Sequence, residues 1–453
     1  MTNDMTSGKP AKLILTFSIP MLLGNIFQQF YSMADTIIVG RTIGVGALAA
    51  VGATGAIAFL ILGFVEGMSG GFTVITAQRF GANDEEGVRR SVATSILLSF
   101  GVVVISTLGA VLAARPLLLF MNTPPDIIDM AYQYIVVIFG GISACVFYNL
   151  ISSMIRALGD SKTPLIFLVI ASVINVVLDL AFILWFHMGV AGAAYATVIA
   201  QAISGFLCLI YVAKRYPILH LHRSDWKFDW GFARDHLRVG IPMALQFSVT
   251  AIGIMVLQGA LNSFGTETVA AFTAASKIEQ LVTGPLGAVG VAIATYSAQN
   301  YGAGKPERVR AGVRSVTLIL LGFSAAAAML AVCFGTDLIS VFISGVTPTV
   351  LERSQLYLNC ISGFFFFLGM LLVFRNVLQG IGRGLMPLIA GIIELVMRTA
   401  CVALFAGSFG YISVCFASPA AWIGAMLPLL VTYLIIMRQM AGKKEGSFPQ
   451  RPV

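Results

Sequence analysis

Long apolar runs dominate this 453-residue chain and constrain its fold more than any other feature. A membrane-spanning helix needs about 20 mostly apolar residues, whereas a spanning β-strand needs about 10 residues with strict alternation. The runs are too long for strands and lack that alternation. Only 11% of the residues are charged, against roughly a quarter in soluble domains. We therefore predict an all-α membrane protein with twelve transmembrane helices.

The predicted spans form two groups of six that are separated by a polar segment. The first six are residues 13–39, 47–78, 91–114, 132–155, 163–186 and 190–213. The second six are residues 237–263, 269–298, 315–334, 356–379, 386–408 and 411–437.

Lysine and arginine lie almost entirely on one side of these spans. That side collects 22 of the 28 basic residues, the other side has 3, and the remaining 3 fall within spans. Because cytoplasmic loops carry the excess of Lys and Arg, this bias places both termini in the cytoplasm. It also explains the net charge of +8 without a nucleic-acid partner. We expect a multi-pass protein of a bacterial inner membrane.

Several short motifs recur at an offset close to 222 residues, which indicates that the two halves are duplicates. Both halves then share one orientation, and parallel repeats of this kind are related by an axis along the membrane normal. A site commonly lies between such halves, and rocking them exposes it alternately; duplication without transport, as in a scaffold, is the alternative. The recurring motifs are Ile19-Pro20-Met21 with Ile241-Pro242-Met243, residues 77–82 with 298–303, and Gly159 and Pro164 with Gly382 and Pro387.

The repeat divides the chain into an N-terminal six-helix lobe (1–213), a cytoplasmic linker (214–236) and a C-terminal six-helix lobe with a tail (237–453). The linker mixes tryptophan and phenylalanine with charged residues, which suits a helix lying in the membrane interface. A plain tether between two lobes is the simpler interpretation.

Polar residues inside the first-lobe spans are the main functional candidates, because an ionisable residue at the membrane centre costs about 3 kcal/mol. On the first and fifth spans they recur at spacings of three and four, so each set forms one stripe on its helix. Two carboxylates in a partly dehydrated cavity would share a proton or bind a cation; hydrogen bonds to neighbouring spans are the structural alternative. The candidates are Asn25, Gln28, Gln29, Ser32, Asp35, Thr36, Tyr134, Asn149, Ser172, Asn175, Asp179 and Thr197.

The second lobe differs, because the positions equivalent to Asp35 and Asp179 are Leu257 and Val402. Its own in-span charges are Lys277, Glu279, Arg375, Glu394 and Arg398. Glu394 and Arg398 are four residues apart, so we expect them to neutralise each other on one helix. In the first lobe, Glu66 fits a gate, a helix contact or a substrate contact equally well.

An enzymatic function is not expected. Residues 67–71 match G-x-S-x-G, but every histidine lies at a span end or in the linker, so glycine-rich helix packing is the better interpretation. The chain has no nucleotide-binding motif and implies no cofactor. Transport energy would therefore come from an ion gradient.

Taken together, these motifs resemble the multidrug and toxic compound extrusion (MATE) transporters, and the resemblance covers essentially the whole chain. It rests on Ile19-Pro20-Met21, Asp35-Thr36, residues 77–82, Arg156 to Asp160 with Pro164, and Asn175 to Asp179. It implies two bundles of six helices forming a V, and export of cationic amphiphilic drugs against inward H⁺ or Na⁺.

The resemblance is strongest to the DinF-like branch, whose ion-coupling residues map onto Asp35, Asn175 and Asp179, and with them Thr197. Gln28, Gln29, Ser32, Tyr134, Asn149 and Glu66 are the corresponding candidates for substrate binding. If the ion is Na⁺, Asp35 and Asp179 would be its ligands. The other main branch uses acids in the second lobe, which are not evident here.

The sequence thus predicts an ion-coupled antiporter that exports organic cations, acts as a monomer and contacts membrane lipid. The alternative within the same superfamily is a flippase for lipid-linked oligosaccharides, which would need a more cationic cavity. A channel or membrane enzyme is the alternative from another class, but no filter or catalytic set is found.

Overall fold

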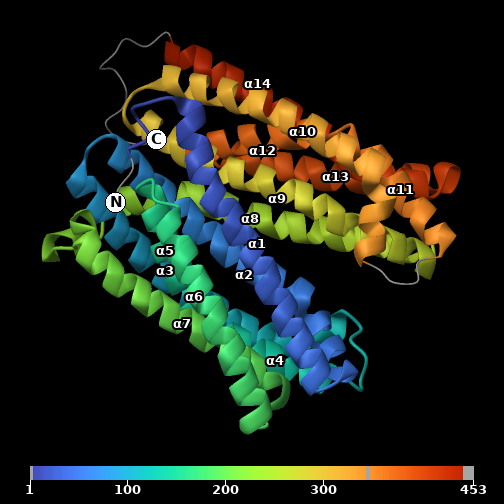
Figure 1. Cartoon of the computed structure of the whole chain (residues 1–453). Helices are drawn as coiled ribbons and strands as arrows, with labels where there is room; N and C mark the ends of the chain where they lie inside the picture. Colours follow the sequence, from blue (N-terminus) through green and yellow to red (C-terminus); the bar gives the residue numbers. More distant parts are fainter. Residues whose placement is uncertain (1–3, 343–346, 442–453) are drawn as a thin grey trace. The chain divides into compact units, whose positions relative to one another are not determined.

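A computed structural model describes residues 4–342 and 347–441. In this part of the chain, helices joined by short loops are the only regular secondary structure, and there is no β-strand (Figure 1). The all-α prediction is therefore confirmed. The predicted cytoplasmic tail beyond residue 441 lies outside the described residues.

The helices follow the predicted spans closely. The first half comprises α1 (Pro10–Thr42), α2 (Val45–Gly81), α3 (Glu85–Phe120), α4 (Ile128–Gly140), α5 (Ile142–Ala157), α6 (Lys162–Leu180), the π-helix η1 (Ala181–Trp185) and α7 (Gly189–Arg215). Two 3₁₀ turns follow, η2 (Pro217–Leu219) and η3 (Arg223–Trp226). The second half comprises α8 (Trp230–Asn262), α9 (Thr266–Gly302), α10 (Pro306–Phe342), α11 (Pro348–Ser362), α12 (Phe365–Gly380), α13 (Leu385–Phe409) and α14 (Tyr411–Ala441).

Within the described residues, ten helices are long and apolar enough to cross a membrane, and two bent pairs bring the number to twelve. The pair α4 and α5 bends by 46°, and the pair α11 and α12 bends by 53°. Each pair covers the predicted fourth span of its half. The bends lie at Gly141 and Gly363, which are 363 − 141 = 222 residues apart, the offset of the sequence repeat.

Glycine is needed at the first of these bends for a packing reason. A Cβ atom on Gly141 would lie 2.2 Å from Cγ2 of Val198 on α7. Real side chains do not approach so closely, so the missing Cβ lets α7 pack directly against the bend. The sequence does not indicate the break between α4 and α5, because apolar residues continue through it.

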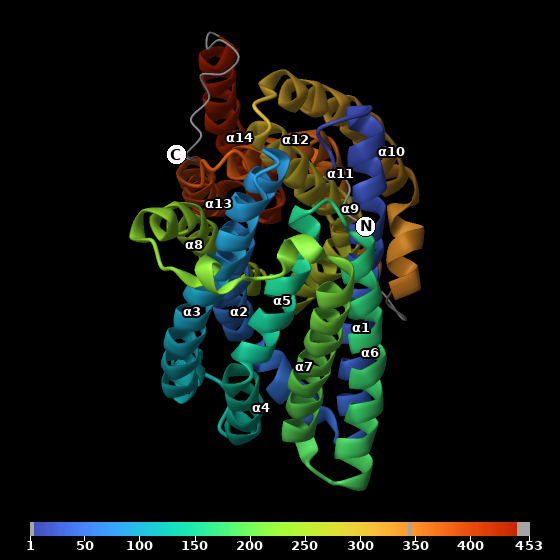
Figure 2. The ribbon, with the colours of Figure 1, turned by 90° about the vertical axis from the view of Figure 1, so that its left-hand side faces the viewer.

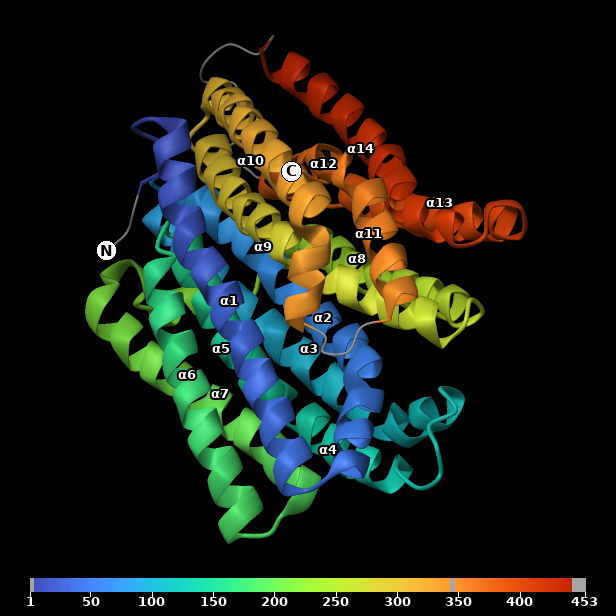
Figure 3. The same cartoon turned by 45° about the vertical axis from the view of Figure 1, so that its right-hand side comes forward.

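The contacts divide the chain into two compact units, one formed by Ile19–Ser248 and the other by Met5–Ser18 together with the chain from Val249 onward. Inside the first unit, α2 packs on α3 and α5, and α7 packs on α5 and α6 (Figure 2). Inside the second unit, α9 packs on α10 and α12, and α14 packs on α12 and α13 (Figure 3). The same pairs of helices are therefore in contact in both units, as a duplication requires.

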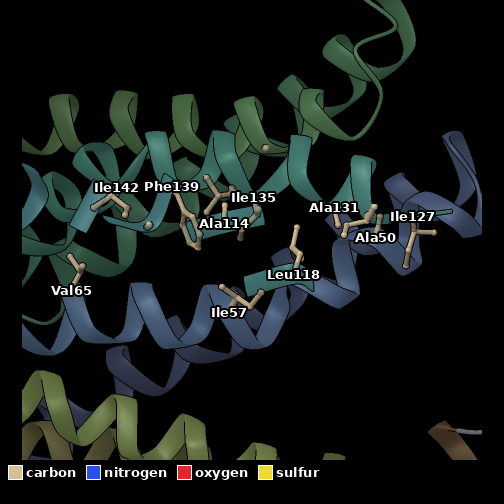
Figure 4. Packing of buried hydrophobic residues seen from close by; sticks show 14 of the residues in the cluster. Ala50, Ile57, Val65, Ala114, Leu118, Ile127, Ala131, Ile135, Phe139 and Ile142 are labelled. Atoms are coloured by element: carbon tan, nitrogen blue, oxygen red, sulfur yellow. The ribbon is translucent and has the colours of Figure 1, made fainter. Parts of the chain in front are cut away.

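The core of the first unit forms where α4 and α5 meet α2 and α3 (Figure 4). Ile135 and Phe139 are four residues apart on α4 and fully buried, as side chains on one helical face should be. Alanines at positions 50, 114 and 131 allow the helix backbones to approach. This packing holds α2 and α5, which carry two of the candidate site residues.

The segment 214–236 belongs to the first unit and is not one continuous helix. Its two 3₁₀ turns precede α8, which already begins at Trp230. Arg89 lies 3.7 Å from Asp225, Arg90 lies 3.5 Å from Asp229, and Ser91 Oγ lies 2.9 Å from Nε2 of His236. The segment is therefore not one continuous helix, because paired charges dock it onto α3, and the interpretation as a tether between the lobes stays a prediction. The lobe boundaries at 213 and 237 stay a prediction.

The G-x-S-x-G segment lies in a close contact between α2 and α8. Ser69 is buried, and its hydroxyl donates to the carbonyl oxygen of Val65 at 3.0 Å, within its own helix. A Cβ on Gly71 would lie 2.5 Å from Cα of Gly240. The glycines therefore let two helix backbones touch, as expected for packing rather than for a nucleophile.

Candidate functional site

Asp35 on α1 and Asp179 on α6 lie near each other inside the first unit, and their carboxyl groups interact electrostatically. Asp179 is completely buried. In the described part of the chain, neither of its oxygens receives a hydrogen bond from an N–H or O–H group, and Oδ1 of Asp35 receives none either. Two carboxylates in contact repel each other, and a proton or another cation between them would remove this repulsion.

A layer of three hydrogen-bonded side chains lies next to the acid pair. Asn175 Nδ2 donates to Oγ1 of Thr197 at 3.2 Å, and the Tyr31 hydroxyl lies 3.3 Å from the same atom. The Thr197 hydroxyl in turn donates to the carbonyl oxygen of Ala193 at 3.1 Å. The Asn175 side-chain oxygen is buried and has no donor. It is therefore a third acceptor beside the two carboxyl groups.

The helix changes its winding just beyond Asp179. Residues Ala181–Trp185 form a π-helix, in which each backbone hydrogen bond spans one more residue than in an α-helix. Asn175 and Asp179 are four residues apart on the preceding α-helix, so their side chains lie on the same face. Only 1% of the Asn175 surface is exposed. The site is therefore built on regular helix and is followed directly by the irregular turn.

A cavity of about 160 Å³ extends from this polar layer through the first unit. Asn175, Thr197 and Tyr31 line one part of it, and Glu66, Asn149 and Arg156 line another. Asn149 Nδ2 donates to Oε1 of Glu66 at 3.5 Å, and Arg156 interacts electrostatically with the same carboxylate. Since pockets for drug-sized ligands measure about 300–1,000 Å³, this cavity suits water and small ions.

Most of the residues named from sequence are brought together here. Asp35, Asn175, Asp179 and Thr197 lie close together in the first unit, and Tyr134 interacts electrostatically with both acids. Gln28, Glu66 and Asn149 line the cavity, together with Asn25 and Ser172. Gln29 and Ser32 are exposed on α1 and are not among the cavity residues, so their proposed role stays a prediction.

Five polar cavity residues were not identified as site candidates from sequence: Tyr31, Tyr148, Arg156, Ser161 and Gln201. Tyr31 is four residues before Asp35, and Gln201 is four residues after Thr197, so helical spacing was a usable signal for both. Tyrosine is common at membrane interfaces, so Tyr31 by itself does not indicate a site. Arg156 was counted among the cytoplasmic basic residues that set the topology.

The charges of the second unit pair differently from the prediction. Glu394 forms an ion pair with Arg375 of the neighbouring helix α12. Arg398 interacts electrostatically with Glu279 on α9, which also accepts a hydrogen bond of 2.8 Å from the Tyr357 hydroxyl. The expected neutralisation of Glu394 by Arg398 is therefore wrong. Spacing along one helix could not show that an arginine from another helix lies closer.

Water access to the cavity gives a direct test of these helical faces. A cysteine at position 172, which lines the cavity, should react with a water-soluble maleimide, because the cavity admits water. A cysteine at position 177 on the same helix should react at least about tenfold more slowly, since Val177 is 60% exposed on the opposite, apolar side and would face lipid, where thiolate does not form. Equal labelling rates at the two positions would mean that the faces of α6 are assigned incorrectly.

Comparisons with known proteins find one matching family model and similar proteins that cover most of the chain. The MatE family model matches residues 20–181 and again 242–404, in agreement with the internal repeat. The chain is 31% identical to the probable multidrug resistance protein YpnP of Bacillus subtilis, over 90% of this chain and 91% of that protein. It is 27% identical to the probable multidrug resistance protein NorM of Thermotoga maritima, over 96% and 93% of the two chains.

A solved structure has the same fold over nearly the whole length. It is described as the outward-facing conformation of a multidrug resistance MATE family transporter of the MOP superfamily. The TM-score is 0.89 at 25% identity, and the match covers 98% of this chain and 100% of that one. The predicted fold class is thereby confirmed.

Proposed function

Because the chain belongs to the MatE family of membrane transporters, we propose that it is an antiporter that exports cationic amphiphilic compounds against an inward flow of H⁺ or Na⁺. As a member of this family it is a multi-pass membrane transporter and not an enzyme. Named relatives are multidrug resistance proteins, which supports drug export. The flippase alternative receives no support from them.

One observation carries the assignment of the ion site: in the described part of the chain, four buried oxygens on three side chains of this cluster receive no hydrogen bond. They are Oδ1 of Asp35, both carboxylate oxygens of Asp179 and Oδ1 of Asn175. An unsatisfied buried acceptor costs about 1–3 kcal/mol, and more when it is charged. A bound proton or Na⁺ would remove this cost, because either one supplies the missing positive charge. We therefore assign ion binding to Asp35 and Asp179, with Asn175 and Thr197 beside them.

Antiport follows if the ion and the drug each favour a different state of the protein. When the acids take up the ion from outside, their negative charge is neutralised and their attraction for a cationic drug is lost. When the ion leaves to the cytoplasm, the charge and the attraction return.

Efflux from proteoliposomes tests the proposal. The purified chain should move a cationic dye uphill when either a proton gradient or a Na⁺ gradient is imposed, and the effective gradient identifies the ion. Vesicles without protein and vesicles with an ionophore that collapses the gradient are the controls. Uphill transport that persists without any ion gradient would contradict an antiport mechanism.

The orientation of the chain is a separate prediction. The segment 214–236 and both termini should lie in the cytoplasm, because the basic residues concentrate on that side. A cysteine at Ser224 should be protected from an impermeant reagent in intact cells and labelled after the membrane is opened. Labelling from outside would mean that the span assignment has to be reversed.

A further inference from the structure

The chain enters α1 through a short segment, Met5–Gly8, which we call the N-terminal strap and which belongs to the second unit. Met5 is only 2% exposed. Its backbone N–H donates to Oε1 of Gln299 at 2.9 Å, and its carbonyl oxygen accepts from Nδ2 of Asn300 at 3.1 Å. Gln299 and Asn300 are themselves completely buried near the end of α9. The backbone of Met5 is therefore fixed by both of its polar groups.

Two basic side chains at the start of α10 bind the rest of the strap. Lys305 Nζ donates to the carbonyl oxygen of Thr6 at 3.2 Å. Arg308 Nη2 donates to the carbonyl oxygens of Met5 at 3.3 Å and Gly8 at 3.0 Å. Hydrogen bonds from a charged donor are about twice as strong as those between neutral groups. Each acceptor is a backbone carbonyl, so the attachment depends on the path of the strap.

The strap attaches a helix that runs through both units. The part of α1 up to Ser18 falls in the second unit, and the part from Ile19 onward falls in the first. α8 does the reverse, since it falls in the first unit up to Ser248 and in the second from Val249 onward. The start of α8 is held in the first unit by the ion pairs of the segment 214–236. For α1, the N-terminal strap provides the corresponding attachment in the second unit.

We propose that the N-terminal strap couples ion binding on α1 to movement of the second unit, with Lys305 and Arg308 as positioning residues. This inference rests on the proposed function and adds the link between its two steps. Coupling requires that the ion changes which state of the protein is favoured. α1 carries Asp35 in the first unit, so a displacement of α1 on ion binding reaches the second unit when the start of the helix is attached there. With the strap released, α1 moves alone, and ion binding no longer drives export.

The double variant Lys305→Gln/Arg308→Gln tests this link, because it removes three hydrogen bonds to the strap. Transport of a cationic dye by the full chain is measured in proteoliposomes, first uphill under an ion gradient and then downhill with equal ion concentrations on both sides. Loss of coupling should lower the uphill rate about tenfold and leave the downhill rate within about twofold of the wild type. Hydrogen–deuterium exchange of the Met5 amide, which should become faster, reports release of the strap.

Further variants separate coupling from a general loss of structure. Deletion of Met5–Gly8 leaves the side chains of α9 and α10 intact and should reproduce the loss of uphill transport. Arg308→Lys keeps a charged donor but loses the planar fork, so its uphill rate should lie between those of the wild type and the double variant. Arg314→Gln changes an exposed arginine of the same helix and should leave both rates unchanged.

Three results would overturn the proposal. The first is an unchanged uphill rate although the Met5 amide exchanges faster. The second is an equal fall of the uphill and downhill rates, which would mean that the strap only stabilises the fold. The third is unchanged exchange in the double variant, since Lys305 and Arg308 would then not hold the strap. A wild-type protein that pumps under neither ion gradient would contradict the proposed antiport as well, whereas the other results leave antiport standing.

Discussion

Replacing Asp179 by asparagine is expected to abolish gradient-driven efflux, lowering the rate to that of vesicles without protein. Asparagine has nearly the same shape but cannot alternate between a charged and a neutral form, so the site no longer exchanges an ion for a drug. Asp179 is fully buried and its oxygens have no donor, so the neutral side chain should not destabilise the fold. Efflux is measured in proteoliposomes, and folding is checked by size-exclusion profile and thermal stability.

The same result is expected for Asp35→Asn, because in the proposed mechanism both carboxyl groups bind one ion, and the two groups interact with each other. Asp126→Asn is the matched control, since Asp126 is exposed in the loop before α4 and should pump normally. If the double variant Asp35→Asn/Asp179→Asn still pumps at the wild-type rate, the acids of the first unit do not couple transport. Glu66, Glu279 and Glu394 would then be the remaining candidates.

Gly71→Ala should destabilise the protein strongly, although it adds a single methyl group. The new Cβ would lie 2.5 Å from Cα and 2.8 Å from the backbone nitrogen of Gly240. Backbone atoms cannot rotate away as a side chain does, so α2 and α8 must separate. Overpacking of this kind typically costs about 1–3 kcal/mol or more. We expect a lower yield of folded protein and an earlier thermal transition in detergent.

Its neighbour Gly70 provides the control for this prediction. A Cβ on Gly70 would meet only Cε of Met243, at 3.8 Å, which is an ordinary contact with a flexible side chain. Gly70→Ala should therefore leave the thermal transition unchanged within about 1 °C. Similar transitions for the two variants would mean that the close approach of α2 and α8 does not limit stability.

The sequence alone determined the number of spans, the internal repeat and the two acids of the first unit. These follow from local physics: apolar length sets a span, and helical periodicity places Asn175 and Asp179 on one face. The cost of a charge in lipid marks Asp35 and Asp179 as candidates for a functional role. Such signals depend on residues close together in the chain, so a single sequence contains them.

Contacts between distant helices were decided only by the tertiary structure. Arg375, 19 residues before Glu394 in sequence, is its ion partner, because α12 and α13 bring the two side chains together. Tyr31 reaches Thr197 across 166 residues, and the bend at Gly141 reflects the approach of Val198 on α7. The sequence shows which side chains are costly to bury, but packing decides which of them compensate one another, because that depends on distances between helices.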